Sequence, residues 1–254
     1  MVEAEDYEGV AADPVAAKYL HPYVGARELL HNEDRWCLWL EDLDPRGLSR
    51  SVILRTRVEA VRESRAASKA ASTREFARYP HLFRQRAKQE VSYVCAPRHV
   101  SETRHYFTVA HFGPEVIAGD ANFTIADPEG FNFAIMSSSM FITWQKTVGG
   151  RIKSDLRFGS TLSWYTVPLP EVSDDLREKI IAAGKGILAT REKHPERSLA
   201  DHYNPLVMDP ALIKAHDRLD ALVDRAFGSE RTCRSEKERQ EILFARYSEM
   251  TGEA

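Results

Sequence analysis

The sequence predicts an α+β protein, in which a mixed or antiparallel sheet domain with flanking helices precedes a small all-α helical bundle. Short segments rich in β-forming residues, separated by Pro, Gly and Asp, occupy residues 91–136. Long amphipathic segments that begin with N-cap residues follow residue 170. The chain has 254 residues, 43% hydrophobic and 29% charged, which is the composition of a globular protein with one large or two ordinary domains.

The first ninety residues are predicted to contain one strand and two helices. The aromatic and aliphatic run Arg35–Leu40 indicates a buried strand, and apolar positions at helical spacing indicate a helix over Leu48–Lys69. Ser72 or Thr73 is the expected cap of a second short helix. In order, we expect an irregular lead-in (1–15), a short helix or turn (15–30), the strand (35–40), a turn (44–47), the helix (48–69) and the second helix (73–83).

The middle of the chain changes to the period of strands. Three consecutive serines, Ser137, Ser138 and Ser139, are typical of a helix cap, and the pair Gly149-Gly150 of a helix end. Two prolines, at 168 and 170, disfavour a helix there. We therefore expect strands at 92–95, 104–110, 116–118, 122–125 and 131–136, a helix from the serines to Val148, and an extended segment over 164–170.

Three helices are predicted after residue 170, over 176–193, 211–227 and 235–250. Pro210 stands at a first-turn position that tolerates proline, and Ser235 with Glu238 forms a capping-box pattern. Helices of this length joined by short loops form a small bundle. The predicted organisation is a lead-in over 1–15, a recognition domain over 16–170 and a helical domain over 171–254.

Charge is strongly segregated along the chain, although the net charge is only −3. Residues 50–104 carry 13 Lys or Arg against 5 Asp or Glu, and residues 146–170 carry 4 against 1. Residues 105–145, between these positive blocks, carry no Lys or Arg. Because the local field of a patch attracts a polyanion, both blocks are compatible with nucleic-acid binding. The alternative is that they are well-solvated helix faces.

The sequence contains no pattern of a membrane or secreted protein. No apolar run approaches the roughly 20 residues needed to cross a bilayer, and the acidic start is unlike a signal peptide. Three widely spaced cysteines, Cys37, Cys95 and Cys233, indicate buried thiols in a reducing compartment. We expect no membrane partner.

Common catalytic motifs are absent from the sequence. It has no Pro-Pro dipeptide, so the Asn/Asp-Pro-Pro-aromatic loop of exocyclic-amine methyltransferases is missing. No Lys has an acidic residue two positions before it, which excludes the Glu-x-Lys pattern of common metal-dependent nucleases. Gly184-Lys185-Gly186 lies within an amphipathic helical segment and is no phosphate loop. We therefore expect no catalytic residue and no metal site.

Two other classes of function stay open. His99, His105 and His111 are spaced by six residues, about 20 Å apart on a straight strand, but a hairpin could unite them with carboxylates in an unrecognised small hydrolase. Alternatively, the C-terminal helices could make the chain a protein–protein scaffold.

A DNA-binding surface is the third and favoured interpretation. Trp144–Pro170 interleaves basic residues with glycines and aromatics, and Lys, Arg, Ser and helix N-termini are the groups that contact phosphates. Base readers are expected between Phe131 and Arg157, where the chain offers Gln and Arg side chains. The candidate DNA contacts are Arg62, Arg65, Lys69, Arg98, Ser101, Arg104, Ser138, Ser139, Gln145, Lys146, Arg151, Lys153 and Arg157.

Four segments, in order, resemble the C-terminal region of MmeI-like (type IIL) fused restriction–modification enzymes. They are Tyr19–Leu40 with KYLHPYVGARELL and RWCLWL, Pro97–Tyr106 with PRHVSETRHY, Ser137–Tyr165 with WQKTVGGRIKSDLRF, and the tail with SLADHYNP, AHDRLD and LFARY. The resemblance covers nearly the whole chain, and the ordered set is more specific than any one segment.

The resemblance implies that this chain corresponds to a target-recognition domain and a helical tail. In that family, one polypeptide also carries a nuclease and an adenine-N6 methyltransferase that uses S-adenosylmethionine. The implied role is non-catalytic recognition of double-stranded DNA, with the methyltransferase domain of the same polypeptide as partner. S-adenosylmethionine, and Mg²⁺ for cleavage, would be bound by the other domains. A cytoplasmic location in a prokaryote is implied as well.

Overall fold

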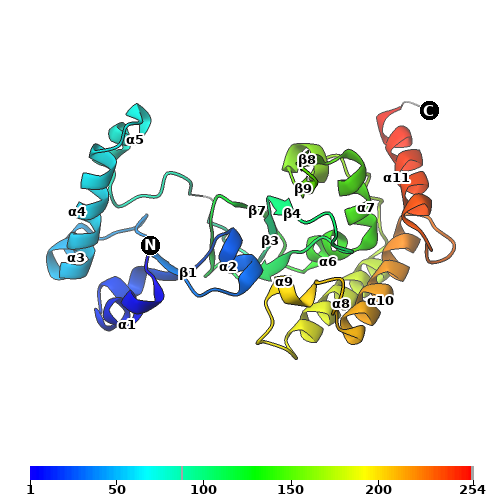
Figure 1. Ribbon diagram of the computed structural model, residues 1–254, viewed down its shortest axis with the longest axis horizontal. Coiled ribbons are helices and arrows are strands. Elements are labelled where there is room, and N and C mark those ends of the chain that lie inside the picture. Colours follow the sequence, from blue (N-terminus) through cyan, green and yellow to red (C-terminus); the bar gives the residue numbers. More distant parts are fainter. Residues whose placement is uncertain (87, 253–254) are drawn as a thin grey trace. The chain divides into compact units, whose positions relative to one another are not determined.

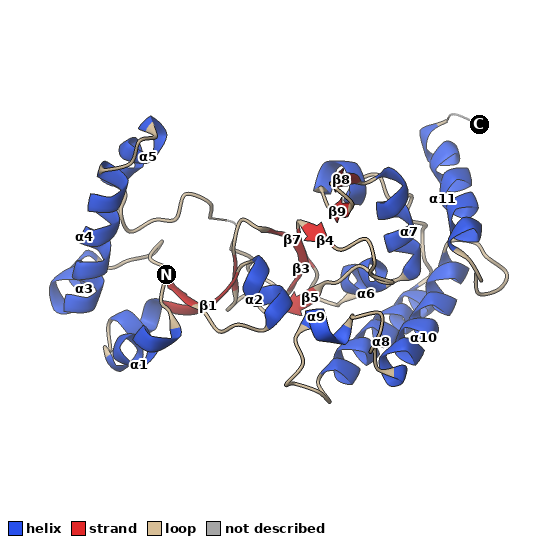
Figure 2. Cartoon of the chain, viewed as in Figure 1, coloured by secondary structure: helices blue, strands red, loops and turns tan. Residues whose placement is uncertain are grey.

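The computed structural model describes residues 1–86 and 88–252, and Figures 1 and 2 show the chain by sequence position and by secondary structure. The chain forms two compact units. Unit 1 comprises Met1–Val24, Glu33–Lys88 and Glu115–Asp120, and unit 2 comprises Gly25–Asn32, Gln89–Pro114 and Ala121–Ala254. Both helices and small sheets are present, so the predicted α+β class is confirmed.

Unit 1 combines helices with a small mixed sheet. β1 lies in the centre of this sheet, antiparallel to β2 and parallel to β6. The strands expected at 35–40 and 116–118 are confirmed, whereas β1 falls in a segment expected to be a helix or turn. The elements are α1 (Ala4–Ala12), η1 (Ala16–Tyr19), β1 (Leu20–Val24), β2 (Trp36–Leu38), α3 (Pro45–Arg50), α4 (Val52–Ala66), α5 (Ala71–Glu75), η2 (Phe76–Arg78) and β6 (Ile117–Ala118).

The expectation of an irregular lead-in over residues 1–15 is wrong. Val2 is fully buried, and its backbone exchanges two hydrogen bonds with Trp36, of 2.8 and 3.0 Å. The helix α1 follows, and its Val10 packs into the same apolar cluster as Val2. The acidic composition of residues 1–15 did not predict this ordered structure, because Trp36, the pairing partner of Val2, lies far along the chain.

The single helix predicted over 48–69 is two helices, separated at Ser51. The Ser51 hydroxyl accepts a hydrogen bond from the backbone N–H of Leu54 (3.1 Å) and donates one to the Asp13 carboxylate (2.7 Å). Ser51 therefore ends α3 and caps α4, because it satisfies an N–H group that has no partner within the helix. Asp44, expected in a turn, caps α3. The second helix, expected over 73–83, is the shorter pair α5 and η2.

Unit 2 contains two three-stranded antiparallel sheets. All five residues of β3 are buried, as expected for a central strand. The strands expected near 92–95 and 122–125 are confirmed as β3 and β7, but most of the expected strand 104–110 has no regular structure. The sheets are ordered β5 (Ala110–Phe112), β3 (Tyr93–Pro97), β7 (Asn122–Ala126) and β4 (His99–Val100), β9 (Asp155–Arg157), β8 (Gly150–Ile152).

The strand expected at 131–136 is instead the helix α6 (Phe131–Ser137). The buried Asp127 carboxylate accepts hydrogen bonds from the backbone N–H groups of Asn132 (3.0 Å) and Phe133 (2.9 Å). These bonds satisfy N–H groups at the start of the helix. The periodicity of a short apolar run does not distinguish a buried helix from a buried strand, so the sequence alone did not reveal α6.

Helices complete unit 2. The three helices predicted after residue 170 are confirmed as α8, α10 and α11, and the helix capped by Ser138 is confirmed as α7. Within the described residues, no helix is long and apolar enough to cross a membrane. The helical elements are α2 (Ala26–His31), α7 (Ser139–Val148), the π-helix η3 (Ser160–Trp164), α8 (Asp174–Arg191), α9 (Leu199–His202), α10 (Pro210–Ala226) and α11 (Glu236–Thr251).

One apolar core runs through unit 2. It includes Val94 of β3, Trp144 of α7, Ile187 of α8 and Leu219 of α10. In Figure 1, α8 and α10 lie on one side of unit 2, and α7 with the β8–β9 hairpin lies on the other. The C-terminal helices thus share their core with the preceding strands, and a division at residue 170 stays a prediction.

A buried polar chain crosses this core. Arg191 donates hydrogen bonds to the Tyr203 hydroxyl and to the Val109 carbonyl oxygen (2.8 Å). Tyr203 lies 2.9 Å from Nε2 of His216, whose Nδ1 lies 3.0 Å from the Ser137 carbonyl oxygen. A carbonyl only accepts, so Nδ1 carries the proton and Nε2 accepts from Tyr203. Burial, with Arg191 nearby, lowers the pKa of His216 to about 3.

The approach of α8 to α6 gives a first test. A Cβ atom at Gly184 would lie 2.8 Å from the Cβ of Ala134, so we expect Gly184→Ala to lower the free energy of unfolding by about 1–3 kcal/mol. Gly186→Ala is the matched control on the same helix, because its added Cβ meets nothing within 4 Å. It should raise stability by about 0.5–1 kcal/mol. Urea denaturation measures both, and an equal gain for the two variants would contradict the close approach.

The neutral state of His216 gives a second test. Its pKa is lowered on folding, so its contribution to stability is present above pH 6.5 and is lost as the pH falls toward 3. Between about pH 6.5 and pH 4, we expect this group to reduce the free energy of unfolding by about 3 kcal/mol. Urea denaturation across this range should give a shallower pH slope for His216→Gln, which cannot take up the proton. Identical slopes would contradict the assignment.

Candidate nucleic-acid interface

The three candidates on α4 of unit 1 and just beyond it have different surroundings. Arg62 is exposed and forms an ion pair with Glu59 at 2.8 Å. Arg65 donates to the carbonyl oxygens of Tyr79 (2.7 Å) and Leu82 (2.8 Å), and its burial lowers its pKa. It therefore holds the following loop, whereas Lys69 is exposed on the surface.

Two candidates at α7 are fully buried. The Ser138 hydroxyl accepts from the backbone N–H of Phe141 (3.3 Å) and donates to the Ile135 carbonyl oxygen (2.6 Å). Gln145 donates from Nε2 to the Arg157 carbonyl oxygen at 3.1 Å. Both side chains are 0% exposed, which leaves no surface for a DNA contact. We therefore remove Ser138 and Gln145 from the candidate interface. They position the start of α7 and the end of β9.

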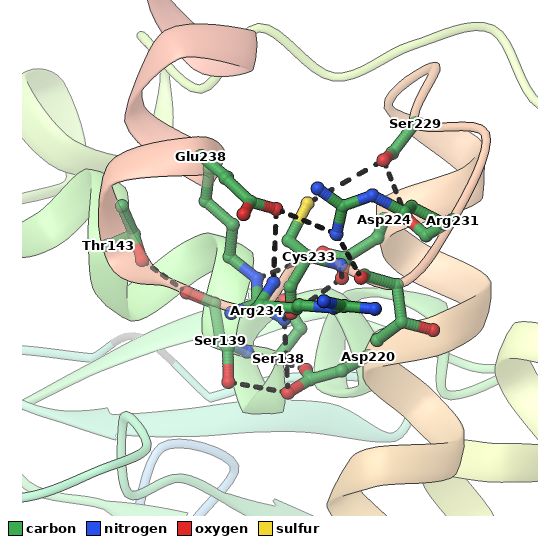
Figure 3. A network of polar contacts seen from close by, with 12 residues as sticks. Ser138, Ser139, Thr143, Asp220, Asp224, Ser229, Arg231, Cys233, Arg234 and Glu238 are labelled. Carbon is green, nitrogen blue, oxygen red and sulfur yellow. Dashed lines mark hydrogen bonds and ion pairs between the residues drawn. The ribbon is translucent and has the colours of Figure 1, made fainter.

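Ser139 and Lys146 connect α7 to the C-terminal helices. The Asp220 carboxylate on α10 accepts hydrogen bonds from the Ser139 backbone N–H (2.8 Å) and hydroxyl (2.5 Å), as Figure 3 shows. Lys146 forms an ion pair with Glu236 of α11 at 3.0 Å. Each side chain has a partner inside the protein that the sequence pattern does not reveal.

The polar network around Asp220 extends to α11. Arg239 donates two hydrogen bonds of 2.9 Å to the Asp224 carboxylate and lies 3.8 Å from that of Asp220. Burial raises the pKa of Asp220 to about 6, against the opposing effects of the Ser139 hydrogen bonds and Arg239. Asp224 also accepts from the Cys233 backbone N–H at 2.8 Å. The network ties α7, α10 and α11 together.

Three candidates surround the β3–β4 connection. Arg98 stacks over the Phe123 ring at 4.9 Å, and its Nε has no hydrogen-bond partner in the part of the chain that the structure describes. Ser101 contacts the Thr103 hydroxyl at 3.1 Å. Arg104 donates to the Ala200 carbonyl oxygen at 2.9 Å, and its burial lowers its pKa. Arg104 thus fixes α9.

The remaining candidates lie on the β8–β9 hairpin, and all three are exposed. Arg151 donates to the Ser154 carbonyl oxygen (3.0 Å) and lies 3.6 Å from the Glu102 carboxylate. Lys153 occupies the turn with a φ of 54°, in the left-handed region. Among the described residues, neither Lys153 nor Arg157 forms an ion pair. These two cations are therefore available to an external anion.

The register of this sheet defines one face. Arg157 is paired with His99 on one side and Gly150 on the other, and Asp155 is paired with Ile152. Paired residues and residues two apart on a strand share a face. The hairpin was not predicted from the sequence, nor was the position of His99 and Ile152 on the same face as Arg157. The alternating pattern R-I-K-S-D-L-R around a Lys-Ser turn is the signal that indicates it.

The histidines are not assembled into a catalytic or metal site. His99 lies on β4, His105 in an exposed loop, and His111 on β5 with its Nε2 2.8 Å from the Asp127 carbonyl oxygen. In the described residues, no group of three or more His, Cys, Asp or Glu side chains could hold a metal ion. The observed separation counts against a histidine-based hydrolase.

Comparison with protein families matches the chain in two parts. Residues 1–171 match the MmeI target recognition domain, and residues 172–253 match the MmeI C-terminal domain. The two matches together cover nearly every residue.

Two proteins to which the chain is similar show its relation to longer enzymes. DNA methyltransferase A of Bacillus subtilis (strain 168) is 31% identical over 238 residues, which is 94% of this chain and 27% of that protein. The solved structure of the type IIL restriction–modification enzyme MmeI in complex with DNA matches with a TM-score of 0.89 and 31% identity, over 99% of this chain and 34% of that chain. The present chain therefore spans only about a third of their lengths or less.

The role of Ser139 in the Asp220 network is testable. We expect Ser139→Ala to lower the free energy of unfolding by about 1–3 kcal/mol, because a buried carboxylate loses one of its donors. Lys153→Ala, in an exposed turn, should change it by no more than about 0.5 kcal/mol. Urea denaturation at neutral pH compares the two. Equal stability of both variants with the parent chain would show that the Ser139 hydroxyl has no structural role.

Proposed function

The chain belongs to the family of MmeI target recognition domains, continued by the MmeI C-terminal domain, and we propose that it selects the DNA sequence on which a restriction–modification enzyme acts. The relative solved in complex with DNA and the relative named a DNA methyltransferase support this role. The single observation in this chain that carries it is the exposed hairpin with Lys153 and Arg157, two cations that form no ion pair within the described residues.

β4 pairs only with Leu156 and Arg157 of β9, so the turn end of the β8–β9 hairpin is two-stranded, a form that fits duplex DNA. The major groove of B-DNA admits a β-ribbon, and Lys or Arg side chains on it contact phosphate oxygens or guanine edges. Arg157 supplies positive charge on the face that also carries the acceptor Asp155, and Lys153 adds a second cation at the turn, whereas Arg151 pairs with Leu156 on the opposite face. The hairpin therefore offers both donors and an acceptor to base edges.

Other candidates take supporting parts in this proposal. Arg98, which is half-buried, and Ser101 flank β4 beside the hairpin and would contact the DNA backbone. Arg62 and Lys69 of unit 1 are proposed as separate phosphate contacts. Arg65, Arg104, Ser139 and Lys146 hold the fold through the contacts described above and are not assigned to DNA.

The chemistry is proposed to belong to other domains of a longer polypeptide. The relatives are about three to four times longer than this chain, and the described residues contain no cluster of metal-ligating side chains. We assign S-adenosylmethionine, and Mg²⁺ for cleavage, to those domains. The methyltransferase domain is then the partner of this chain, which acts without catalytic residues of its own. A cytoplasmic location in a prokaryotic cell follows from this role.

DNA binding by the hairpin has a quantitative signature. Removing one cation that contacts a phosphate should reduce the slope of log affinity against log salt concentration by about one. We expect Lys153→Ala and Arg157→Ala each to weaken binding to duplex DNA and to flatten this slope. Fluorescence anisotropy with random-sequence duplexes, between about 50 and 200 mM salt, measures both quantities.

Lys185→Ala is the matched control, because it removes the same charge from an exposed position on α8. It should leave the affinity and the slope nearly unchanged. The proposed function is rejected if the chain binds no duplex at low salt. Assignment to the hairpin is rejected if all three variants lose affinity equally.

A further inference from the structure

The π-helix η3 begins directly after the basic hairpin. Only Phe158 and Gly159 separate the last residue of β9, Arg157, from the first residue of η3, Ser160. π-helical turns are rare and are frequently found at functional sites. The proposed function does not use this segment, although it lies next to the cations that carry that proposal.

The position of η3 relative to the hairpin is fixed at both ends. Phe158 is 2% exposed and packs against the rings of Phe107 (5.4 Å between centroids) and Phe123 (5.2 Å). At the other end, the Trp164 ring lies 6.0 Å from that of Phe141. The turn therefore rests on the aromatic core that also holds β9.

Hydrogen bonds make the turn rigid. The Thr166 hydroxyl donates to the Leu162 carbonyl oxygen at 2.6 Å and accepts from the indole N–H of Trp144 at 3.2 Å. The backbone N–H of Tyr165 donates to the Ser160 carbonyl oxygen at 2.8 Å. A segment held this firmly presents its side chains with little further loss of conformational entropy on binding.

Two large apolar side chains nevertheless point away from the core. Leu162 is 51% exposed and Tyr165 is 74% exposed. Leaving such groups in water forgoes the free energy of burial that their neighbours Phe158 and Trp164 gain. A rigid turn that exposes an aromatic and an aliphatic side chain, beside the cations of the hairpin, has the chemistry of a surface that takes nucleic-acid bases.

We propose that Tyr165 and Leu162 form a wedge that stacks on bases of the DNA held by the hairpin. This inference rests on the proposed function. The cations of β9 and its turn would hold the phosphate backbone, and the wedge would enter the base stack from the adjoining turn. Enzymes that modify a base must turn it out of the duplex, which leaves neighbouring bases unstacked. The wedge supplies apolar surface to cover such bases.

The adjoining charge favours DNA over a protein partner for this surface. Lys is depleted at protein interfaces, whereas Lys153 occupies the turn of the hairpin that leads into η3. Apolar wedges in DNA-binding proteins act together with Lys and Arg that hold the backbone.

The test compares substitutions in the wedge and in the hairpin of the 254-residue chain. The probe is a duplex selected by the chain from a random-sequence pool. We expect Tyr165→Ala to weaken binding roughly 5- to 150-fold, as for loss of one stacked base, with the salt slope unchanged because no charge is lost. Tyr165→Phe keeps the ring and should bind as the parent chain does. Leu162→Ala should weaken binding in the same sense.

A second readout reports the bases themselves. Permanganate oxidises thymines that are unstacked, so thymines at the insertion point should react in the complex with the parent chain and less with Tyr165→Ala. Thermal melts of each variant verify folding, and exposed Thr161→Ala serves as a neighbouring control.

The outcomes separate this inference from the function on which it rests. Unchanged affinity and permanganate reactivity for Tyr165→Ala, while Arg157→Ala loses affinity, would overturn the wedge and leave the DNA-binding function standing. A flattened salt slope for Tyr165→Ala would also overturn it, since the ring carries no charge. If the parent chain binds no duplex at low salt, both proposals fall together.

Discussion

Burial of Phe158 is the constraint on which the surface of unit 2 depends. Its backbone N–H donates to the Arg98 carbonyl oxygen at 2.8 Å, and its ring lies within 6.2 Å of Phe107, Phe123 and Phe141. Phe158 directly follows the last residue of β9 and, with Gly159, connects the basic hairpin to the π-helix, so one buried side chain holds both elements to the core. Their exposed groups are thereby presented in a fixed arrangement, as recognition of a rigid duplex requires.

Several candidate DNA-contact residues instead form hydrogen bonds to polar groups inside the protein. Arg65 and Arg104 donate to carbonyl oxygens, and Ser139 donates to the Asp220 carboxylate. Buried acceptors without donors are costly, so the fold uses these side chains to satisfy them. What remains for an external anion is a smaller set, centred on Lys153 and Arg157, and this makes the proposed interface more specific than the charge pattern alone.

The sequence predicted well those helices whose caps and periodicity lie within their own segment. The C-terminal helices have amphipathic spacing, Asp209 and Ser235 cap α10 and α11, and Ser138 caps α7 as its sequence indicates. Two features with distant partners were missed. β1 pairs with β2 and β6, and Val2 pairs with Trp36. A short window of sequence does not contain both partners of the long-range pairings.

The sequence by itself determined the α+β class, the resemblance to a target-recognition region and the cationic segment around the hairpin, because these depend on composition, local periodicity and ordered motifs. Only the tertiary structure decided which cations are available. Lys153 and Lys146 are the same residue type in the same basic segment. Lys153 occupies an exposed turn, whereas Lys146 forms an ion pair with Glu236 of α11. Availability to DNA depends on what the fold places within about 4 Å of each charge, and that is a property of packing across the chain.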